Sequence, residues 1–221
     1  PATLHDAVTA VLAAEGLRDA VVRITVTRGI AGGRPVRTGA WVEAEALGGR
    51  LWVGTRTRHA DGGPAGARVM VSQTPFAAGW IARHKTTSRL AWDLAREEAR
   101  AAGVDEALLV NRAGEILEGA ASNLFVVLPG GEVVTPPLSA DVLPGVTRAL
   151  VLESCARLGI PAREGPVTLE SLRFADEVFL TNSVQEVLPV AMMGGRAVPA
   201  RATTLRLLAD YRELVAATTR V

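Results

Sequence analysis

The sequence predicts an α+β fold for this chain of 221 residues. Helical and strand-like segments are mixed without the regular βαβ alternation of a doubly wound fold. Several short strand-like segments stand at hairpin spacing between two strong helices. Because 48% of the residues are hydrophobic, a sizeable core is expected. The length fits one large domain, or a domain and a half.

The first third of the chain begins with a helix and a strand. Residues 2–17 form an amphipathic pattern that ends near a glycine, and residues 20–27 form a β-branched run typical of a buried strand. The apolar stripe of the helix consists of Leu4, Val8, Val11 and Leu12. Residues 29–66 are rich in Gly and Arg and are expected to form loops with short strands. Residues 68–72 predict a further strand.

The remaining elements follow in order. The clearest helix is expected at 87–102, with an apolar stripe and a solvated face, and a second strong helix at 146–158. Short strands are predicted at 106–111, 115–117, 123–127 and 133–134, with glycine-containing turns at 113–114 and 130–131. A short helix at 169–174, a strand at 177–181 and a terminal helix at 203–216 complete the pattern.

Charge and cysteine content limit the classes of function. The chain has 24 basic and 23 acidic residues, a net charge of +1, which argues against a nucleic-acid-binding protein. Apolar runs such as 20–27 are too short to cross a bilayer, and no basic segment of a signal peptide precedes them. The single cysteine, Cys155, excludes an intramolecular disulfide and fits the reducing cytoplasm. No metal site is predicted.

Lys85 is the only lysine among the 24 basic residues; all the others are arginine. Arginine replaces lysine as a surface charge but not as a Schiff-base former, because the guanidinium is never deprotonated in a protein. At the junction of a loop and the long helix, burial would lower the pKa of the amine, and a neutral amine attacks an aldehyde. The alternative is an exposed lysine left by compositional bias, although a cation near a helix N-terminus opposes the helix dipole.

Three more segments carry candidate chemistry. Glu118 precedes three small residues that make a tight turn which a large ligand can approach. Gly145 stands before a helix start, where free N–H groups and the hydroxyl of Thr147 form an anion site. The strand at 177–181 runs into hydroxyl and amide side chains around Ser183. The alternatives are a surface turn, ordinary helix initiation after proline, and a polar strand exit.

The order of these segments resembles the class IV aminotransferase family, the fold-type IV pyridoxal-5′-phosphate enzymes. That family includes branched-chain aminotransferases, D-amino-acid aminotransferases and 4-amino-4-deoxychorismate lyases. The resemblance covers about residues 68–200, with weaker similarity at 23–29. It implies an α+β fold whose large C-terminal domain is a pseudo-barrel. Residues 67–221 would form the cofactor-binding catalytic domain, and residues 1–66 a remnant of the smaller N-terminal domain and the interdomain region.

The resemblance also implies a role for each matching residue. Lys85 matches the Schiff-base lysine, and Glu118 matches the glutamate that pairs with the pyridine nitrogen of pyridoxal 5′-phosphate. The phosphate would be held by Gly145, Val146, Thr147 and Ser183, and Leu143 would pack on the cofactor ring. The resemblance further implies a small-molecule substrate, an amino acid or a keto acid, and a homodimer whose active site borders the neighbouring subunit.

Some positions depart from the family pattern and leave the reaction open. Leu90 stands where branched-chain enzymes carry a tyrosine. The Lys85–Arg89 spacing and the Thr-Asn-Ser motif at 181–183 lean toward lyase-like or other small-molecule branches, whereas Glu186 followed by Val187 looks more like the amino-acid aminotransferases. The family's smaller domain supplies an arginine to the phosphate, and the chain is expected to begin after that residue. We therefore expect an aminotransferase. Its alternatives are a 4-amino-4-deoxychorismate lyase and a truncated relative that binds cofactor without turnover.

Overall fold

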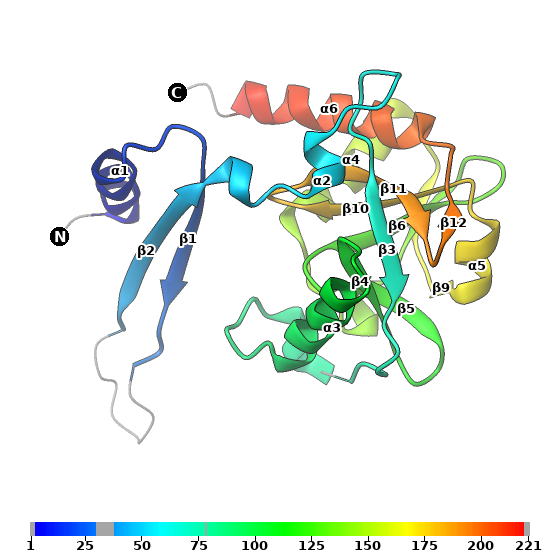
Figure 1. The fold of residues 1–221 in the computed structure, drawn as a ribbon, viewed down its shortest axis with the longest axis horizontal. Helices are drawn as coiled ribbons and strands as arrows, with labels where there is room; N and C mark the ends of the chain where they lie inside the picture. The colour runs from blue at the N-terminus through cyan, green and yellow to red at the C-terminus, as the bar shows by residue number, and fades with distance from the viewer. Residues whose placement is uncertain (1–2, 30–37, 78, 219–221) are drawn as a thin grey trace. The chain divides into compact units, whose positions relative to one another are not determined.

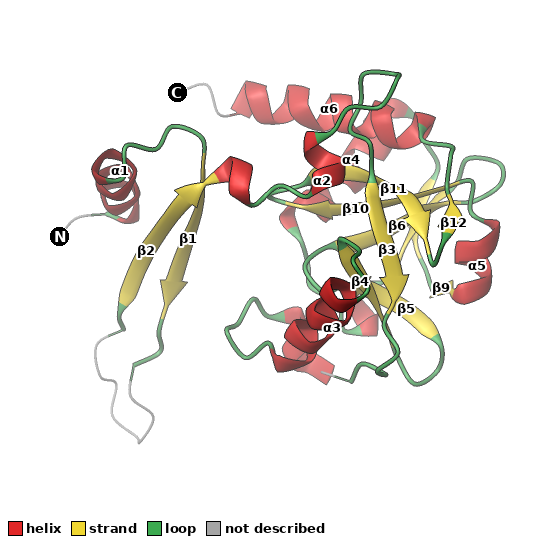
Figure 2. Ribbon diagram, in the orientation of Figure 1, coloured by secondary structure: helices red, strands yellow, loops and turns green. Residues whose placement is uncertain are grey.

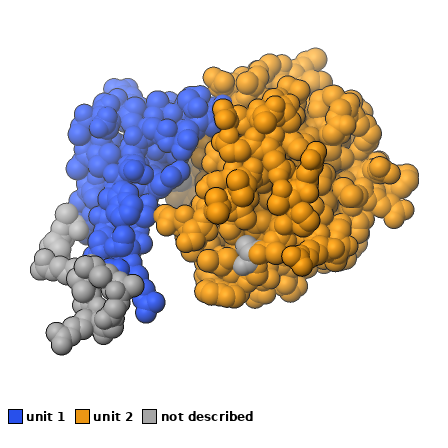
Figure 3. All heavy atoms as spheres, turned by 60° about the horizontal axis from the view of Figure 1, so that its bottom comes forward, with its two compact units in different colours: residues 1–51 blue, residues 52–221 orange. Residues whose placement is uncertain are grey.

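The computed structural model describes residues 3–29, 38–77 and 79–218. The chain divides into two compact units, residues 1–51 and 52–221, which Figure 3 distinguishes by colour. The division falls earlier in the chain than the boundary expected after residue 66. Each unit is described by itself. Among the described residues, no helix is long and apolar enough to span a membrane.

In its described residues, the first unit has one α-helix, a two-stranded sheet and a short 3-10 helix. Helix α1 spans Leu4–Ala14, strands β1 and β2 span Ala20–Val26 and Ala40–Ala46, and the 3-10 helix η1 spans Leu47–Gly49. Thr3 begins α1 with a capping box, accepting from the Asp6 N–H at 3.2 Å and donating its own N–H to the Asp6 carboxylate at 2.8 Å. Strand β1 pairs antiparallel with β2 along its whole length.

The strand expected at 20–27 is confirmed as β1, but the expectation that it is buried is wrong. No described residue of the first unit is fully buried, and Val26 is 62% exposed. A two-stranded sheet with one helix supplies too few layers to cover its apolar side chains. The predicted loop region 29–66 contains the seven-residue strand β2, and residues 30–37 of that region lie outside the described residues.

The second unit contains most of the secondary structure (Figure 1). Its strands are β3 (Ala67–Val71), β4 (Glu106–Val110), β5 (Glu115–Gly119), β6 (Asn123–Val127), β7 (Val133–Thr135), β8 (Ala162–Glu164), β9 (Val167–Thr168), β10 (Glu177–Asn182), β11 (Glu186–Met193) and β12 (Arg196–Ala197). Its helices are α2 (Val53–Arg56), α3 (Leu90–Ala101), α4 (Val146–Leu158), α5 (Leu169–Phe174) and α6 (Ala202–Thr218), with 3-10 turns η2 (Gly79–Arg83) and η3 (Leu138–Ala140).

Six of these strands close into a barrel. Hydrogen-bonded neighbours follow the order β6, β10, β11, β3, β4, β5, and β5 pairs again with β6. The pairs β11–β3 and β3–β4 are parallel, and the other pairs of the circuit are antiparallel. Strands β7, β8, β9 and β12 extend the sheet beyond the circuit. The expected α+β fold with a barrel-like sheet is therefore confirmed.

Side chains alternate between the inside and the outside of this barrel, as the pleat of a strand requires. Each of the six strands contributes a buried residue to one internal cluster: Val69, Leu108, Ile116, Leu124, Leu180 and Leu188. Outward-facing residues of β4 and β5 pack with Trp92, Ala95 and Ala99 of α3. Phe125 and Phe179, stacked with their ring centroids 4.8 Å apart, pack in a third cluster with α4 and α6. Figure 2 shows these helices around the strands.

Most element bounds agree with the sequence expectations, and the differences have local causes. Helix α3 begins at Leu90, later than the predicted start at 87, because no side chain caps its N-terminus and residues 85–89 are irregular. Strand β11 was not predicted, since its start is polar and Pro189 lacks the N–H that a strand residue normally donates.

Candidate active site

Glu118 lies at the point where the barrel closes, near the end of β5 and just before the tight loop 119–122. It stands opposite Asn123 in the β5–β6 pairing and is only 3% exposed. One carboxylate oxygen, Oε2, accepts from the N–H of Leu143 at 2.9 Å and from Asn123 Nδ2 at 3.2 Å. The other, Oε1, accepts from Trp92 Nε1 at 3.1 Å. Three donors from three parts of the chain therefore fix this carboxylate.

Burial raises the pKa of Glu118 above its ordinary value. The hydrogen bonds from Leu143 and Trp92 oppose that rise, and so do the positive charges of Arg89 and Lys85. Both cations belong to the segment that leads into α3. The charged form of this buried carboxyl group is therefore stabilised by the hydrogen bonds and the cations around it.

Lys85 lies in the irregular segment between η2 and α3 with an exposed side chain, so the burial considered for it from the sequence is not found. Its charge acts on Glu118, so the lysine and the glutamate that the sequence singled out lie within electrostatic range of each other. Arg89, four residues later, donates Nη2 to the carbonyl oxygen of Ala120 at 2.7 Å. That bond ties the end of the lysine segment to the loop that follows Glu118.

The segment 143–147 brings a helix N-terminus to the same place. Gly145 is the N-cap of α4, and no side chain caps the helix, so its first N–H groups are open to a ligand. Asn123 Nδ2 donates to the carbonyl oxygen of Leu143 at 2.9 Å. A Cβ added at Gly145 would overlap Asn123 Oδ1, which explains why a glycine stands there. Val146 is largely exposed, whereas Thr147 is buried.

Ser183 is exposed in the turn between β10 and β11. Asn182 shapes this turn: its Oδ1 accepts from the N–H groups of Val184 at 2.9 Å and Gln185 at 2.7 Å. Its Nδ2 donates to the carbonyl oxygen of Ala121 at 3.1 Å. Because β10 pairs with β6 up to the end of both strands, the turn lies next to the loop 119–122.

Glu106 is a buried carboxylate that the sequence reasoning missed. It is 1% exposed on β4, and it accepts from the N–H of Ala121 at 2.9 Å, from Ser122 Oγ at 2.9 Å and from the N–H of Ala107 at 3.2 Å. Burial raises the pKa of Glu106 to about 7, against the effect of these hydrogen bonds and of the Arg96 charge. The loop 119–122 is therefore held by Glu106 from β4 and by Asn182 from the end of β10.

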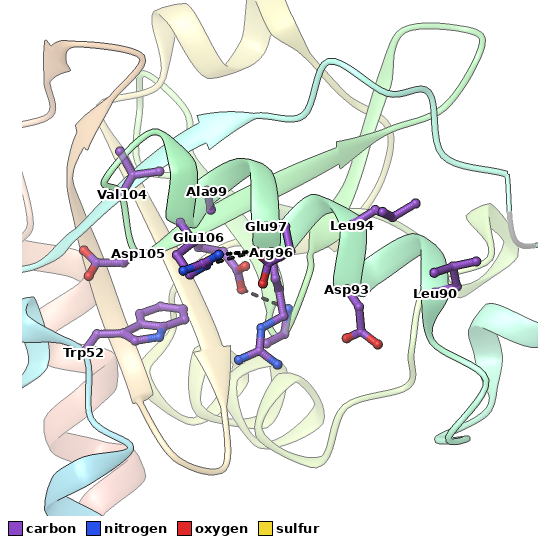
Figure 4. A pocket seen from close by; sticks show the side chains of 12 residues that line it. Trp52, Leu90, Asp93, Leu94, Arg96, Glu97, Ala99, Val104, Asp105 and Glu106 are labelled. Carbon is purple, nitrogen blue, oxygen red and sulfur yellow. Dashed lines mark hydrogen bonds and ion pairs between the residues drawn. The ribbon is translucent and has the colours of Figure 1, made fainter.

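An open hollow of about 700 Å³ lies beside α3 (Figure 4). Its lining is Trp52, Leu90, Asp93, Leu94, Arg96, Glu97, Ala99, Arg100, Val104, Asp105, Glu106 and Ala121. None of the residues predicted for the site is among them. The hollow and the predicted site share only the loop 119–122, through Ala121 and the carboxylate that holds it.

The structure thus brings Lys85, Glu118, the 143–147 segment and the Ser183 turn around one loop. The sequence reasoning did not assign Trp92, Asn123, Asn182 or Glu106, which connect them. For the two asparagines a signal existed, since an amide at the end of an apolar strand is buried only when it is hydrogen-bonded. Within the described ranges, no cluster of three His, Cys, Asp or Glu side chains is arranged to hold a metal ion.

The same barrel and helices occur in solved structures of branched-chain aminotransferases. The enzyme of Thermoproteus uzoniensis, solved with norvaline, is 28% identical, with a TM-score of 0.83 over 98% of this chain and 72% of that chain. Another branched-chain amino acid aminotransferase, complexed with N-(5′-phosphopyridoxyl)-L-glutamate, is 30% identical, with a TM-score of 0.79 over 98% of this chain and 71% of that chain. The fold is therefore that of these aminotransferases.

Sequence comparison gives the family. The profile of amino-transferase class IV matches residues 1–193, and the chain belongs to the class IV aminotransferase family. A Methanocaldococcus jannaschii protein, provisionally named a branched-chain-amino-acid aminotransferase, is 32% identical over 87% of this chain and 65% of its own length. The branched-chain-amino-acid aminotransferase of Escherichia coli K12 is 40% identical over 46% of this chain and 33% of its own length. The chain thus spans less than two thirds of these relatives.

Proposed function

We propose that this chain is the cofactor-holding part of a pyridoxal-5′-phosphate-dependent aminotransferase, in which Lys85 forms the Schiff base. The observation that carries the proposal is Glu118: a buried carboxylate, fixed by three donors and within electrostatic range of the only lysine in the sequence. A carboxylate in that setting suits a protonated ring nitrogen, because a charge-assisted hydrogen bond offsets the cost of its burial.

The polar groups of the site fit the three polar groups of pyridoxal 5′-phosphate, which are the aldehyde, the ring nitrogen and the phosphate. Lys85 supplies the primary amine for the aldehyde, and Glu118 supplies the acceptor for the ring nitrogen. The phosphate would be held by Gly145, Val146, Thr147 and Ser183, through the uncapped N–H groups at the start of α4 and the hydroxyls of Thr147 and Ser183, with Leu143 against the ring. When bound, the cofactor supplies an electron sink for the substrate's Cα electrons.

The protein's own contribution is to place protons. Glu118 keeps a proton on the ring nitrogen through a charge-assisted hydrogen bond, and Trp92, Asn123 and Leu143 hold its oxygens in place. Lys85 would be the base that takes the Cα proton of the amino acid and the acid that gives it back. The loop 119–122, held by Glu106 and Asn182, is joined to the segment of Lys85 by the hydrogen bond from Arg89 to the carbonyl oxygen of Ala120.

The relatives support an amino acid and keto acid pair as substrates. Two of the similar structures and the Escherichia coli relative are named branched-chain aminotransferases, and one of these structures contains norvaline. These names favour amine transfer over the lyase alternative. We further propose that residues 67–221 are the cofactor domain, that residues 1–66 belong to the smaller domain and its linker, and that the protein acts as a homodimer in the cytoplasm.

A spectroscopic panel tests the proposal. The purified protein loaded with pyridoxal 5′-phosphate is mixed with branched-chain L-amino acids, D-amino acids and aminodeoxychorismate, and the cofactor absorbance is followed. We expect a full spectral change with the L-amino acids and release of a keto acid. Release of pyruvate and an aromatic amine from aminodeoxychorismate alone would instead support the lyase, and no change with any compound would contradict both.

A further inference from the structure

Trp92, a residue of α3, donates a hydrogen bond to Glu118 Oε1. Its indole N–H lies 3.1 Å from Oε1, and its side chain is 7% exposed. The bonds from Leu143 and Asn123 both go to the other oxygen, Oε2. The indole nitrogen is only a donor, so this contact favours a charged acceptor. Trp92 therefore stabilises one particular oxygen of the carboxylate.

The indole is itself held on two sides. The ring of Phe76 meets it edge-on, with the centroids 4.8 Å apart and the planes at 71°. The guanidinium of Arg89 lies 5.5 Å from the Trp92 ring centroid, and it is anchored by its bond to the carbonyl of Ala120. Arg89 and Trp92 are three residues apart at the start of α3 and so lie on one side of the helix. The direction of the indole N–H is thus fixed before any ligand binds.

We propose that Trp92 is a positioning residue that keeps the Glu118 carboxylate oriented and ionised for the cofactor ring nitrogen. This inference rests on the proposed function for the identity of the ligand, but the Trp92–Glu118 contact exists without it. The charged groups that act on Glu118 are Arg89 and Lys85, both in or before the first turn of α3. Trp92 donates a hydrogen bond to Glu118 without adding a charge. A third cation at that position would compete with the protonated ring nitrogen for the carboxylate.

The consequence appears in a titration of the loaded protein. Without the indole N–H, the proton shared with the ring nitrogen moves toward Glu118 and the ring loses positive charge. The nitrogen of Lys85 bound to the cofactor then keeps its proton to higher pH. In Trp92→Phe, the midpoint of the cofactor absorbance against pH should rise, by less than the roughly 1 unit that one hydrogen bond to a charged group is worth at Glu118 itself. The matched control is Trp52→Phe. Trp52 lines the hollow beside α3 and is not one of the three donors to the Glu118 carboxylate.

A double-mutant cycle separates positioning from packing. In a Glu118→Gln background, Trp92→Phe should cause almost no further change, because the charge through which the indole acts is gone. A midpoint in Trp92→Phe equal to that of the wild type would overturn the inference. So would an equal shift with and without Glu118.

A titration of Glu118 in the protein without cofactor is a second, independent test. With ¹³C-labelled glutamate, and the Glu118 signal assigned by its loss in Glu118→Gln, the pKa of Glu118 should rise in Trp92→Phe and stay unchanged in Trp52→Phe. If the wild type takes no cofactor on Lys85 but this rise is seen, the proposed function fails and the role of Trp92 stands. If the cofactor binds and the pKa of Glu118 does not move, the role of Trp92 fails alone.

Discussion

Glu118 and Asn123 face each other across the β5–β6 pairing that closes the barrel, and Asn123 Nδ2 donates to the Glu118 carboxylate at 3.2 Å. The same amide nitrogen donates to the carbonyl of Leu143 at 2.9 Å. The residue pair that closes the sheet is therefore also the pair that joins the candidate acid to the start of α4. Closure of the barrel and assembly of the site depend on the same contacts.

Replacement of Asn123 should show this coupling. Asn123→Ala leaves the Leu143 carbonyl without this donor and removes one of the three donors of Glu118. We expect a loss of about 2–4 kcal/mol in the free energy of unfolding. Chemical denaturation followed by circular dichroism measures it, and a change within about 0.5 kcal/mol, typical of a surface site, would contradict the coupling.

Glu118→Gln removes the negative charge of Glu118 and keeps nearly the same side-chain shape. The amide still accepts a hydrogen bond but stabilises a protonated ring nitrogen poorly, so the cofactor should stay bound while removal of the Cα proton slows by roughly 10²-fold. Stopped-flow absorbance of the first half-reaction gives the rate. An unchanged rate would show that Glu118 does not serve the ring nitrogen.

Gly145→Ala tests the helix N-terminus as a phosphate site. The added Cβ overlaps Asn123 Oδ1, so the Asn123 amide or the start of α4 must shift, which disturbs the N–H groups proposed to hold the phosphate. We expect cofactor affinity to fall about tenfold or more, as measured by equilibrium titration. Gly48→Ala, where nothing lies within 4 Å of the added Cβ, is the control. Equal affinity in both variants would place the phosphate elsewhere.

Glu106 should make stability depend on pH. Its pKa is about 7 in the folded protein against an ordinary 4.5, so the folded state holds the proton more tightly. This contribution is complete below pH 4.5 and is lost as the pH rises through 7, for a total of about 3 kcal/mol. Glu106→Gln should flatten the decline in unfolding free energy over that interval. A decline of the same size in the variant would assign it to other groups.

Local signals in the sequence were enough for the elements and for several site residues. Helix α4 was predicted with the correct bounds, with Pro144 and Gly145 preceding its start. Gly159, at a positive φ, follows its last residue. Lys85 stood out because it has no equivalent elsewhere in the chain. These are properties of neighbours in sequence and of composition, which a single sequence contains.

The connections between the site residues depend on the closed barrel and could not be predicted in the same way. Trp92 and Glu118 are joined only because α3 packs on β4 and β5, and Glu106 reaches Ser122 only because β4 and β5 pair. In the sequence alone, a tryptophan on the apolar face of a helix predicts an ordinary core residue. A glutamate at the start of a strand predicts an ordinary surface residue. The strand β1 was wrongly expected to be buried for the same reason: the layer that would cover it cannot be read from its own residues.

The proposed function depends on a covalent bond between Lys85 and the cofactor. The measurement is borohydride reduction of the protein loaded with pyridoxal 5′-phosphate, followed by peptide mass spectrometry, with Lys85→Arg as the matched control that keeps the charge and loses the nucleophile. We expect one reduced adduct, on Lys85, in the wild type and none in the variant. An adduct on another amine, or a wild type that carries none after reduction, would contradict it.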